Sequence, residues 1–165
     1  MSQNTLSVTV VDSVSKPLEL VRQEMIDMAF HETGIVHPNV KFTVLAKDAE
    51  ITRFRQEAKI LGGSHVNEII SRETGDGAVI QDFISGPNKG AHVTIAFQPD
   101  GNQSTRVGIT IDLPLKGLRK LLLPLLRSVV AKGASKALRE DMQCLENGSY
   151  EDFLARSRKS PAQQQ

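Results

Sequence analysis

Residues 92–113 read HVTIAFQPDGNQSTRVGITIDL, and this stretch decides the fold. Apolar side chains alternate with polar ones on both sides of Pro99-Asp100-Gly101-Asn102. Alternation with a period of two is typical of a strand with one covered face, and the Pro-Asp-Gly-Asn run favours a chain reversal. The sequence therefore predicts an antiparallel hairpin of two strands, His92–Gln98 and Thr105–Leu113. Its inward residues are expected to be Val93, Ile95, Phe97, Val107, Ile109 and Ile111.

A long amphipathic helix is expected directly after this hairpin. Apolar residues recur at helical spacing from Leu118 to Leu145, which is about 7 or 8 turns and about 45 Å. Asn147-Gly148 is a typical C-cap pair. Pro124 is expected to kink or divide the helix near its first two turns, because proline removes a backbone donor and clashes with the preceding turn.

The first half of the chain adds a strand, a helix and a meander. Residues 6–14 alternate with period two, and a helix is expected from Pro17 to about Glu32. After a break at residues 32–39, alternation resumes in Val40–Val44, Ile51–Leu61, His65–Ser71 and Ala78–Ser85. The predicted fold is α+β: a curved antiparallel sheet of about seven strands wrapped around the long C-terminal helix, with one or two short helices after the first strand.

Composition excludes several classes of protein. The chain has 20 Lys and Arg against 19 Asp and Glu, so no nucleic-acid partner is expected. Leu121–Val130 is too short for stable membrane insertion, and the N-terminus shows no secretion signal, so a cytoplasmic location is expected. The single cysteine, Cys144, is expected to be a buried or half-buried residue of a helix. None of the four histidines shows the close spacing of a helical metal site, so neither a metal nor a cofactor is expected.

A long sheet bent over a helix leaves space between the two, and small molecules commonly bind in such a space. The residues expected on the concave face are small or medium, and only 4% of the chain is aromatic, with no tryptophan. This shortage of bulky side chains favours an open cavity. A core filled by side chains is the alternative.

The order of elements resembles the START-like superfamily, also called SRPBCC or helix-grip proteins. The resemblance covers nearly all of the chain and predicts one START-like domain over residues 1–153, followed by a polar, flexible tail over residues 154–165. Its local pieces are Phe54-Arg55-Gln56 through Ile60-Leu61-Gly62, Ser85-Gly86-Pro87-Asn88-Lys89-Gly90 and the helix end Ala137–Gly148. The family includes hydrophobic-ligand carriers and polyketide aromatase/cyclases, whose function varies with the cavity lining, so the fold alone does not give an activity.

The residues expected to contact a ligand face the predicted cavity from the strands and from the long helix. They are Phe42, Thr52, Phe54, Gln56, Ala58, Gln81, Phe83, Val93, Ile95, Val107, Ile109, Leu126, Val130 and Ala134.

Three residues are candidates for catalysis. Gln56 falls on a covered strand face, where its amide needs a partner. Of Gln81 and Asp82, one is expected to face inward, and the pattern does not say which; a buried Asp82 would have a raised pKa and could act as an acid or base. His31, the third candidate, and His37 flank the break after the first helix, where the resemblance places part of the pocket entrance. Ligand contact is one role for these two histidines, and a surface or capping role is the alternative.

The sequence thus favours a protein that binds or carries an apolar small molecule, such as a lipid, quinone, isoprenoid or polyketide. The alternative is a cyclase, aromatase or dehydratase acting on a polyketide-like substrate in the same cavity. Leu121–Leu126 is apolar nearly all round, which leaves a protein-interaction role and homo-oligomer formation open.

Overall fold

The protein is described by a computed structural model covering residues 5–60, 63–115, 117 and 122–159. Its strands are β1 (Thr5–Val14), β2 (Val40–Lys47), β3 (Ile51–Ile60), β4 (Gly63–Glu73), β5 (Val79–Ser85), β6 (His92–Pro99) and β7 (Thr105–Pro114). Its helices are α1 (Leu18–Ile26), α2 (Met28–Glu32), α3 (Leu123–Glu146) and α4 (Ser149–Lys159). The α+β fold class predicted from the sequence is confirmed.

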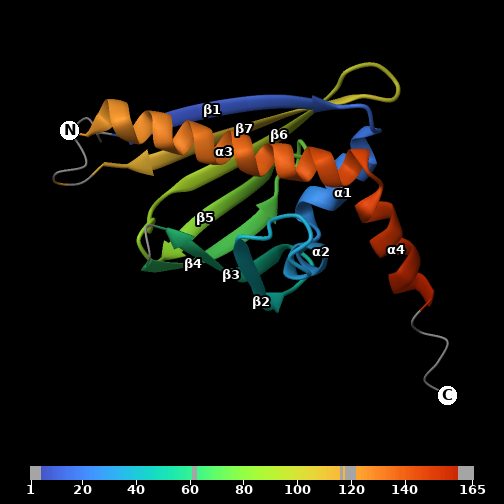
Figure 1. The fold of residues 1–165 in the computed structure, drawn as a ribbon, viewed down its shortest axis with the longest axis horizontal. Coiled ribbons are helices and arrows are strands. Elements are labelled where there is room, and N and C mark those ends of the chain that lie inside the picture. The colour runs from blue at the N-terminus through green and yellow to red at the C-terminus, as the bar shows by residue number, and fades with distance from the viewer. Residues whose placement is uncertain (1–4, 61–62, 116, 118–121, 160–165) are drawn as a thin grey trace.

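The seven strands form one antiparallel sheet in the order β1-β7-β6-β5-β4-β3-β2. The sheet is curved, and the long helix α3 lies across it beside β1, while α1 and α2 stand at one end of the sheet (Figure 1). Because the first strand pairs with the last, both edges of the sheet come from the N-terminal part of the chain, β1 on one side and β2 on the other. This is the sheet wrapped around a helix that the sequence predicts.

The hairpin of β6 and β7 confirms the inward face expected from alternation. Val93 lies opposite Ile111 and Ile95 opposite Ile109, and antiparallel partners share one face of the sheet. Val93, Ile95 and Ile109 are buried. β-branched side chains pack well on a pleated surface, which favours strands in this segment, and both strands lie inside the sheet rather than at its edges.

The first helical segment divides in two, where the sequence predicts one helix to about Glu32. Asp27 has ψ near 85°, which is not helical, so α1 ends before it. The Asp27 carboxylate then accepts hydrogen bonds from the backbone N–H groups of Ala29 at 3.1 Å and Phe30 at 3.4 Å. Such N-capping starts a new helix, so a local side-chain interaction overrides the continuous apolar pattern.

The sequence predicts that Pro124 kinks or divides a helix that starts at Leu118, and the described part of this helix starts just before the proline. α3 begins at Leu123, which places Pro124 in the first turn, where its missing N–H would have no intrahelical partner anyway. The predicted start at Leu118 lies outside the described residues. At the other end, Asn147 is the C-cap and Gly148 has a φ of 76°, as the sequence predicts.

A further helix follows this cap. α4 continues to Lys159, so residues 154–159 are helical, and residues 160–165 lie outside the described residues. The division into a domain and a flexible tail stays a prediction. Among the described helices, none is both long and apolar enough to cross a membrane.

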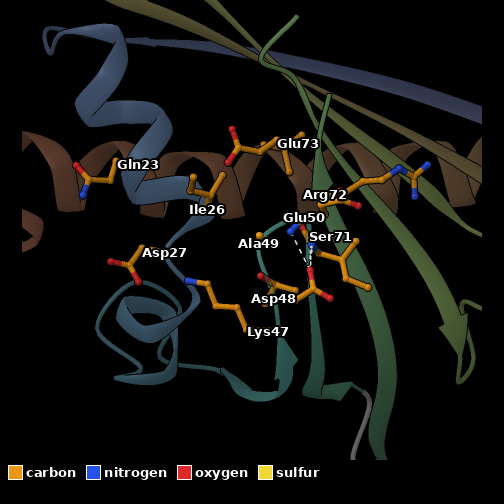
Figure 2. Close-up of a pocket in the computed structure, with 13 residues that line it drawn as sticks. Gln23, Ile26, Asp27, Lys47, Asp48, Ala49, Glu50, Ser71, Arg72 and Glu73 are labelled. Atoms are coloured by element: carbon orange, nitrogen blue, oxygen red, sulfur yellow. Dashed lines mark hydrogen bonds between the residues drawn. The ribbon is translucent and has the colours of Figure 1, made fainter. Parts of the chain in front are cut away.

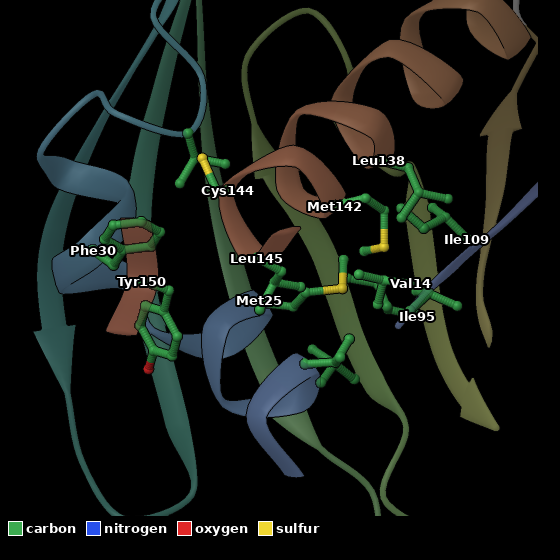
Figure 3. Close-up of a cluster of buried hydrophobic side chains, with 14 of the residues drawn as sticks. Val14, Met25, Phe30, Ile95, Ile109, Leu138, Met142, Cys144, Leu145 and Tyr150 are labelled. Carbon is green, nitrogen blue, oxygen red and sulfur yellow. The ribbon is translucent and has the colours of Figure 1, made fainter. Parts of the chain in front are cut away.

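The main core lies where α1, the C-terminal half of α3 and the start of α4 meet the sheet (Figure 3). Leu138 and Leu145 of α3 are 1% and 0% exposed, and Tyr150 of α4 is 0% exposed. Each fully buried large apolar side chain stabilises the fold by about 1.5–3 kcal/mol relative to exposure. This end of α3 is therefore fixed against the sheet, and it carries the residues of the candidate site.

Candidate functional site

A pocket of about 190 Å³ lies between the sheet and helices α1, α2 and α3. Twelve of its lining residues are apolar: Met25, Met28, Phe42, Phe54, Ile69, Phe83, Val93, Ile95, Ile109, Ile111, Ala134 and Ala137. The remaining lining residues are His31, His37, Gln56, Gln81 and Asp141. We call this the central pocket. Its position matches the space predicted between the sheet and the long helix.

Most residues that the sequence assigns to ligand contact line the central pocket. They are Phe42, Phe54, Gln56, Gln81, Phe83, Val93, Ile95, Ile109 and Ala134. Two of the three catalytic candidates, His31 and Gln56, line it as well. Contact of these residues with a ligand stays a prediction.

Five residues assigned to ligand contact do not line the central pocket. Val107 is 0% exposed within the core, and Leu126 and Val130 pack against the separate apolar cluster around Leu6 and Leu113. Ala58 lines a different hollow of about 690 Å³, together with the side chains of Lys41, Glu57, Lys59 and Lys136. Period-two alternation predicts on which face of a strand a residue lies. The curvature of the sheet then determines which residues of that face reach the central pocket.

Thr52 lines another hollow of about 270 Å³ beside the turn between β2 and β3 (Figure 2). Its walls include the charged side chains of Lys47, Asp48 and Arg72. The Asp48 carboxylate accepts hydrogen bonds from the backbone N–H groups of Glu50 and Ile51, both at 2.8 Å. These groups hold the turn, and the charged walls do not suit an apolar ligand.

The structure resolves which of Gln81 and Asp82 faces inward. Gln81 lies opposite Val93, which also lines the central pocket. Asp82 lies opposite His92, and Nδ1 of His92 is 2.7 Å from Oδ1 of Asp82. Asp82 also accepts a hydrogen bond from Arg72 at 2.6 Å. Gln81 therefore faces the pocket, and Asp82 faces away from it.

The hypothesis that Asp82 is a buried acid or base is wrong. Its side chain is 35% exposed. The small degree of burial raises the pKa of Asp82, but the hydrogen bonds from His92 and Arg72 outweigh burial, so its pKa is lowered below the usual value. Asp82 is a charged partner in a surface ion-pair cluster.

The polar groups of the central pocket include a buried cluster of His31, His37 and Asp141. Nε2 of His31 lies 3.5 Å and Nε2 of His37 lies 3.3 Å from the same oxygen, Oδ1 of Asp141. The three residues are 6%, 8% and 4% exposed. They come from α2, from the connection between α2 and β2, and from α3, so the cluster forms only when these three segments pack together.

The other ring nitrogens of the two histidines are held by separate partners. Nδ1 of His31 lies 3.0 Å from the backbone carbonyl oxygen of Asp27. Nδ1 of His37 lies 2.7 Å from Oε2 of Glu140. Because carbonyl and carboxylate oxygens accept, each Nδ1 donates, and these bonds fix the orientation of both rings.

Burial and charge oppose each other in this cluster. Burial lowers the pKa of His37, but the carboxylates of Asp141 and Glu140 outweigh burial, and the pKa lies above its usual value. Burial raises the pKa of Asp141, but the imidazoles of His31 and His37 outweigh burial, and that pKa lies below its usual value. Asp141 is thus held as a carboxylate in a site that excludes most water.

The sequence pointed to His31 and His37 but not to Asp141 or to its pairing with them. Asp141 follows Leu138 by three residues and precedes Leu145 by four, so it lies on the buried side of α3, and its histidine partners are about 100 residues earlier in the chain. Two signals were available: a carboxylate at helical spacing among the apolar residues of the long helix, and the pair of histidines on either side of the break after the first helix. Spacing within one helix, the pattern on which the prediction of no metal rested, cannot reveal a cluster assembled from three segments.

The N-terminal half of α3 leaves apolar side chains on the surface. Leu122, Leu125 and Val129 are 51%, 61% and 59% exposed. This agrees with the apolar character noted in the sequence for Leu121–Leu126, although residue 121 lies outside the described residues. Self-association through this face stays a prediction.

No family model matches the chain, and no curated protein matches its sequence. Solved structures match its fold. An aromatase/cyclase, Zhui, from Streptomyces sp. R1128 is similar with a TM-score of 0.75 at 14% identity, covering 88% of this chain and 96% of that one. A START superfamily protein from Mycobacterium smegmatis has a TM-score of 0.71 at 15% identity, covering 86% and 97%.

Norcoclaurine synthase from Thalictrum flavum, solved in complex with dopamine and hydroxybenzaldehyde, has a TM-score of 0.66 at 12% identity and covers 86% of each chain. At these identities the likeness concerns the fold alone. The sheet, the long helix and the short helices after the first strand thus form a START-like fold.

Proposed function

We propose that this chain, which has the START-like fold, binds a small and mostly apolar molecule in the central pocket. The observation that carries the proposal is the lining: twelve apolar side chains surround the pocket, and His31, His37 and Asp141 are grouped in its wall. Ligand pockets are commonly apolar with a few polar groups that fix orientation. The central pocket has this composition, whereas the hollows that Thr52 and Ala58 line have charged walls.

The size of the pocket indicates the class of ligand. A dry cavity of about 150 Å³ is large enough for benzene. At about 190 Å³, the central pocket suits a molecule with one or two rings, or one end of a longer lipid, quinone, isoprenoid or polyketide. The dopamine and hydroxybenzaldehyde named for norcoclaurine synthase are single-ring compounds, which supports this size class by analogy of fold.

The polar groups suggest how the ligand is oriented. Gln56 on β3 and Gln81 on β5 are the uncharged polar side chains of the lining. An amide offers both donors and an acceptor, so either residue can pair with a hydroxyl or carbonyl oxygen of the ligand. We expect the apolar body of the ligand to contact the phenylalanine and isoleucine side chains.

A second candidate function is a cyclase, aromatase or dehydratase acting in the same pocket. It is favoured by the two imidazoles that face a buried carboxylate in the pocket wall, because histidine can transfer protons near neutral pH. The Zhui aromatase/cyclase has the same fold, which supports this candidate by analogy only. His31 and Gln56 are its candidate residues because both line the central pocket, whose lining does not include Asp82.

The experiment is binding of 4-hydroxybenzaldehyde to the full chain by calorimetry, together with native mass spectrometry of protein purified from cell extract. Ala134 of α3 is 8% exposed and lines the pocket, so Ala134→Leu should fill part of it and weaken binding by at least about tenfold. Ser135 is exposed on the same helix, so Ser135→Leu is the matched control and should bind normally.

Native mass spectra should show a small-molecule adduct that is lost on denaturation. An adduct released with unchanged mass supports a carrier, whereas conversion of the compound supports an enzyme. Absence of both the adduct and probe binding, or equal binding by Ala134→Leu and the parent, would contradict the proposal. The same spectra report whether the chain self-associates.

A further inference from the structure

In the cluster of His31, His37 and Asp141, three atoms that carry lone pairs face one another. This arrangement favours binding of a cation. Nδ1 of His31 donates to the Asp27 carbonyl, and Nδ1 of His37 donates to Glu140. In the neutral form of each ring, Nε2 then carries a lone pair, and both Nε2 atoms face Oδ1 of Asp141. Two nitrogen lone pairs and a carboxylate oxygen repel one another unless positive charge lies among them.

The Asp141 oxygen is also without a hydrogen bond. Among the described residues, Oδ1 of Asp141 is a buried atom with no hydrogen-bond partner, and the residue is 4% exposed. A buried carboxylate oxygen left in this state is costly. The oxygen therefore lacks a partner, and either a proton on an imidazole ring or a metal ion could be that partner.

The distances favour a metal ion over protons on the rings. An imidazolium that donates to a carboxylate forms a hydrogen bond of about 2.7–2.9 Å. The two N···O separations are 3.5 and 3.3 Å. An ion about 2.1 Å from each ligand atom places neighbouring ligands about 3.0–3.4 Å apart, which matches these separations more closely.

We propose that His31, His37 and Asp141 bind a divalent first-row transition-metal ion through Nε2, Nε2 and a carboxylate oxygen. The three ligand atoms lie within 4.8 Å of one another, and all three residues are buried. Two imidazoles with one carboxylate suit Zn²⁺, Fe²⁺ or Co²⁺, whereas Ca²⁺ and Mg²⁺ prefer oxygen ligands throughout.

The surroundings of the cluster are those of a metal centre. Metal-binding histidines usually donate their other ring nitrogen to a carboxylate or a backbone carbonyl, as His37 and His31 do here. The ring of Phe42 lies 5.7 Å from each imidazole, measured between centroids, and shields the site from water. Nζ of Lys136 forms an ion pair with Oε1 of Glu140 at 3.8 Å.

Three protein ligands leave coordination positions open, as catalytic metal sites do. Because all three ligands line the central pocket, an open position faces the space in which we propose that a small molecule binds. An oxygen atom of that molecule could then coordinate the ion. The metal site itself does not depend on the proposed function, since its ligands are protein side chains alone.

The test is metal binding by the full chain after treatment with a chelator, in buffer without any organic ligand. Co²⁺ is added first, because its visible absorption reports the ligand set, and Zn²⁺ affinity is then measured by competition. We expect one equivalent to bind. His31→Ala, His37→Ala and Asp141→Asn should each weaken binding more than about 100-fold, and Glu140→Ala, which removes an outer partner, by about 10–100-fold.

His92→Ala is the matched control, since His92 also pairs with an aspartate, Asp82, but on the outer side of the sheet. It should bind metal as the parent does. Circular dichroism identifies any variant that does not fold. If the three ligand variants fail to fold, NMR of the parent decides: on addition of Zn²⁺ the imidazole signals of His31 and His37 should shift, and those of His65 and His92 should not.

The proposal is overturned if the parent binds no Co²⁺ or Zn²⁺, if His37→Ala binds as tightly as the parent, or if binding is lost in His92→Ala. Failure of the 4-hydroxybenzaldehyde experiment does not affect these outcomes, because no organic ligand is present.

Discussion

The hydroxyl of Tyr150 donates a hydrogen bond to Oδ2 of Asp27 at 3.1 Å and so joins α4 to the junction of α1 and α2. Oδ1 of the same carboxylate caps α2 through Ala29 and Phe30. The rings of Tyr150 and Phe30 pack with centroids 5.0 Å apart. One buried contact therefore positions the helix that carries His31.

Replacement of Tyr150 by phenylalanine tests this contact. Tyr150→Phe keeps the ring but removes the donor, so we expect the free energy of unfolding to fall by about 1–2 kcal/mol, measured by urea denaturation. Ser157→Ala removes the hydrogen bond from the exposed Ser157 to Phe153 in the same helix and should change it by less than about 0.5 kcal/mol. Equal losses in the two variants would contradict a special role for Tyr150.

Glu24 of α1 should make stability depend on pH. Its side chain is 0% exposed, and neither carboxylate oxygen has a hydrogen-bond partner among the described residues. Burial raises the pKa of Glu24 to about 10, and the nearby charges of Asp141 and Asp27 add to the effect. The folded protein therefore keeps this proton when the unfolded chain has lost it.

A raised carboxyl pKa stabilises the fold fully below the usual pKa of 4.5, and this contribution is lost as pH rises toward 10. Glu24→Gln removes the ionisation. We expect the variant to be more stable than the parent by at least about 1 kcal/mol near pH 8, with a smaller gain near pH 5. Denaturation at both pH values measures this, and Glu19→Gln, at an exposed position of α1, is the control. A gain that does not change with pH would count against the raised pKa.

Gly86, directly after β5, should not tolerate a side chain. Its φ is +89°, and a Cβ there would lie 2.1 Å from the carbonyl oxygen of Val66 and 2.9 Å from Cα of Asn67. Because both contacts are with backbone, we expect Gly86→Ala to lower the free energy of unfolding by about 2–5 kcal/mol.

Gly101 is the matched control, since its φ is +82° and a Cβ there would meet no atom within 4 Å. Gly101→Ala carries only the backbone strain and should lose about 1–2 kcal/mol. Thermal or urea unfolding of the two variants separates strain from steric overlap. Similar losses would show that the close approach of the β4 backbone to Gly86 does not contribute to the loss of stability.

The thiol of Cys144 should react slowly in the folded protein. The residue is 6% exposed, as expected from the sequence, and burial raises its pKa to about 11, with further contributions from the carboxylates of Glu24, Asp141 and Glu140. The thiolate is the reactive form, so labelling with Ellman's reagent near pH 8 should be more than about 100-fold slower than in denaturant. Comparable rates in the two conditions would contradict this burial.

The sequence predicted those features that depend on local patterns. Alternation gave the inward face of β6 and β7 correctly because the period of a strand is a local property. For β5, alternation showed only that Gln81 and Asp82 face opposite sides. Both sides of that strand carry apolar residues, so the pairing of Asp82 with His92 had to come from the packed sheet.

Features that depend on several segments could not be predicted in this way. The division between α1 and α2 follows from the side chain of Asp27, which competes with the helix pattern. The group formed by His31, His37 and Asp141 requires α2 and α3 to meet, and no spacing along the chain encodes that meeting. Most of the pocket lining was predicted, whereas its buried charged group was not.

The pairing of β1 with β7 also bears on how the chain reaches its native state. Partners such as Val8 and Ile111 are roughly 100 residues apart, so this ladder joins nearly the two ends of the domain. Contacts at such separation form slowly, because the entropy cost of closing a large loop comes before the contacts stabilise the chain. During synthesis, β1 has no strand to pair with until β7 has left the ribosome, and until then the edge of β6 that β7 later covers is open to association with other chains.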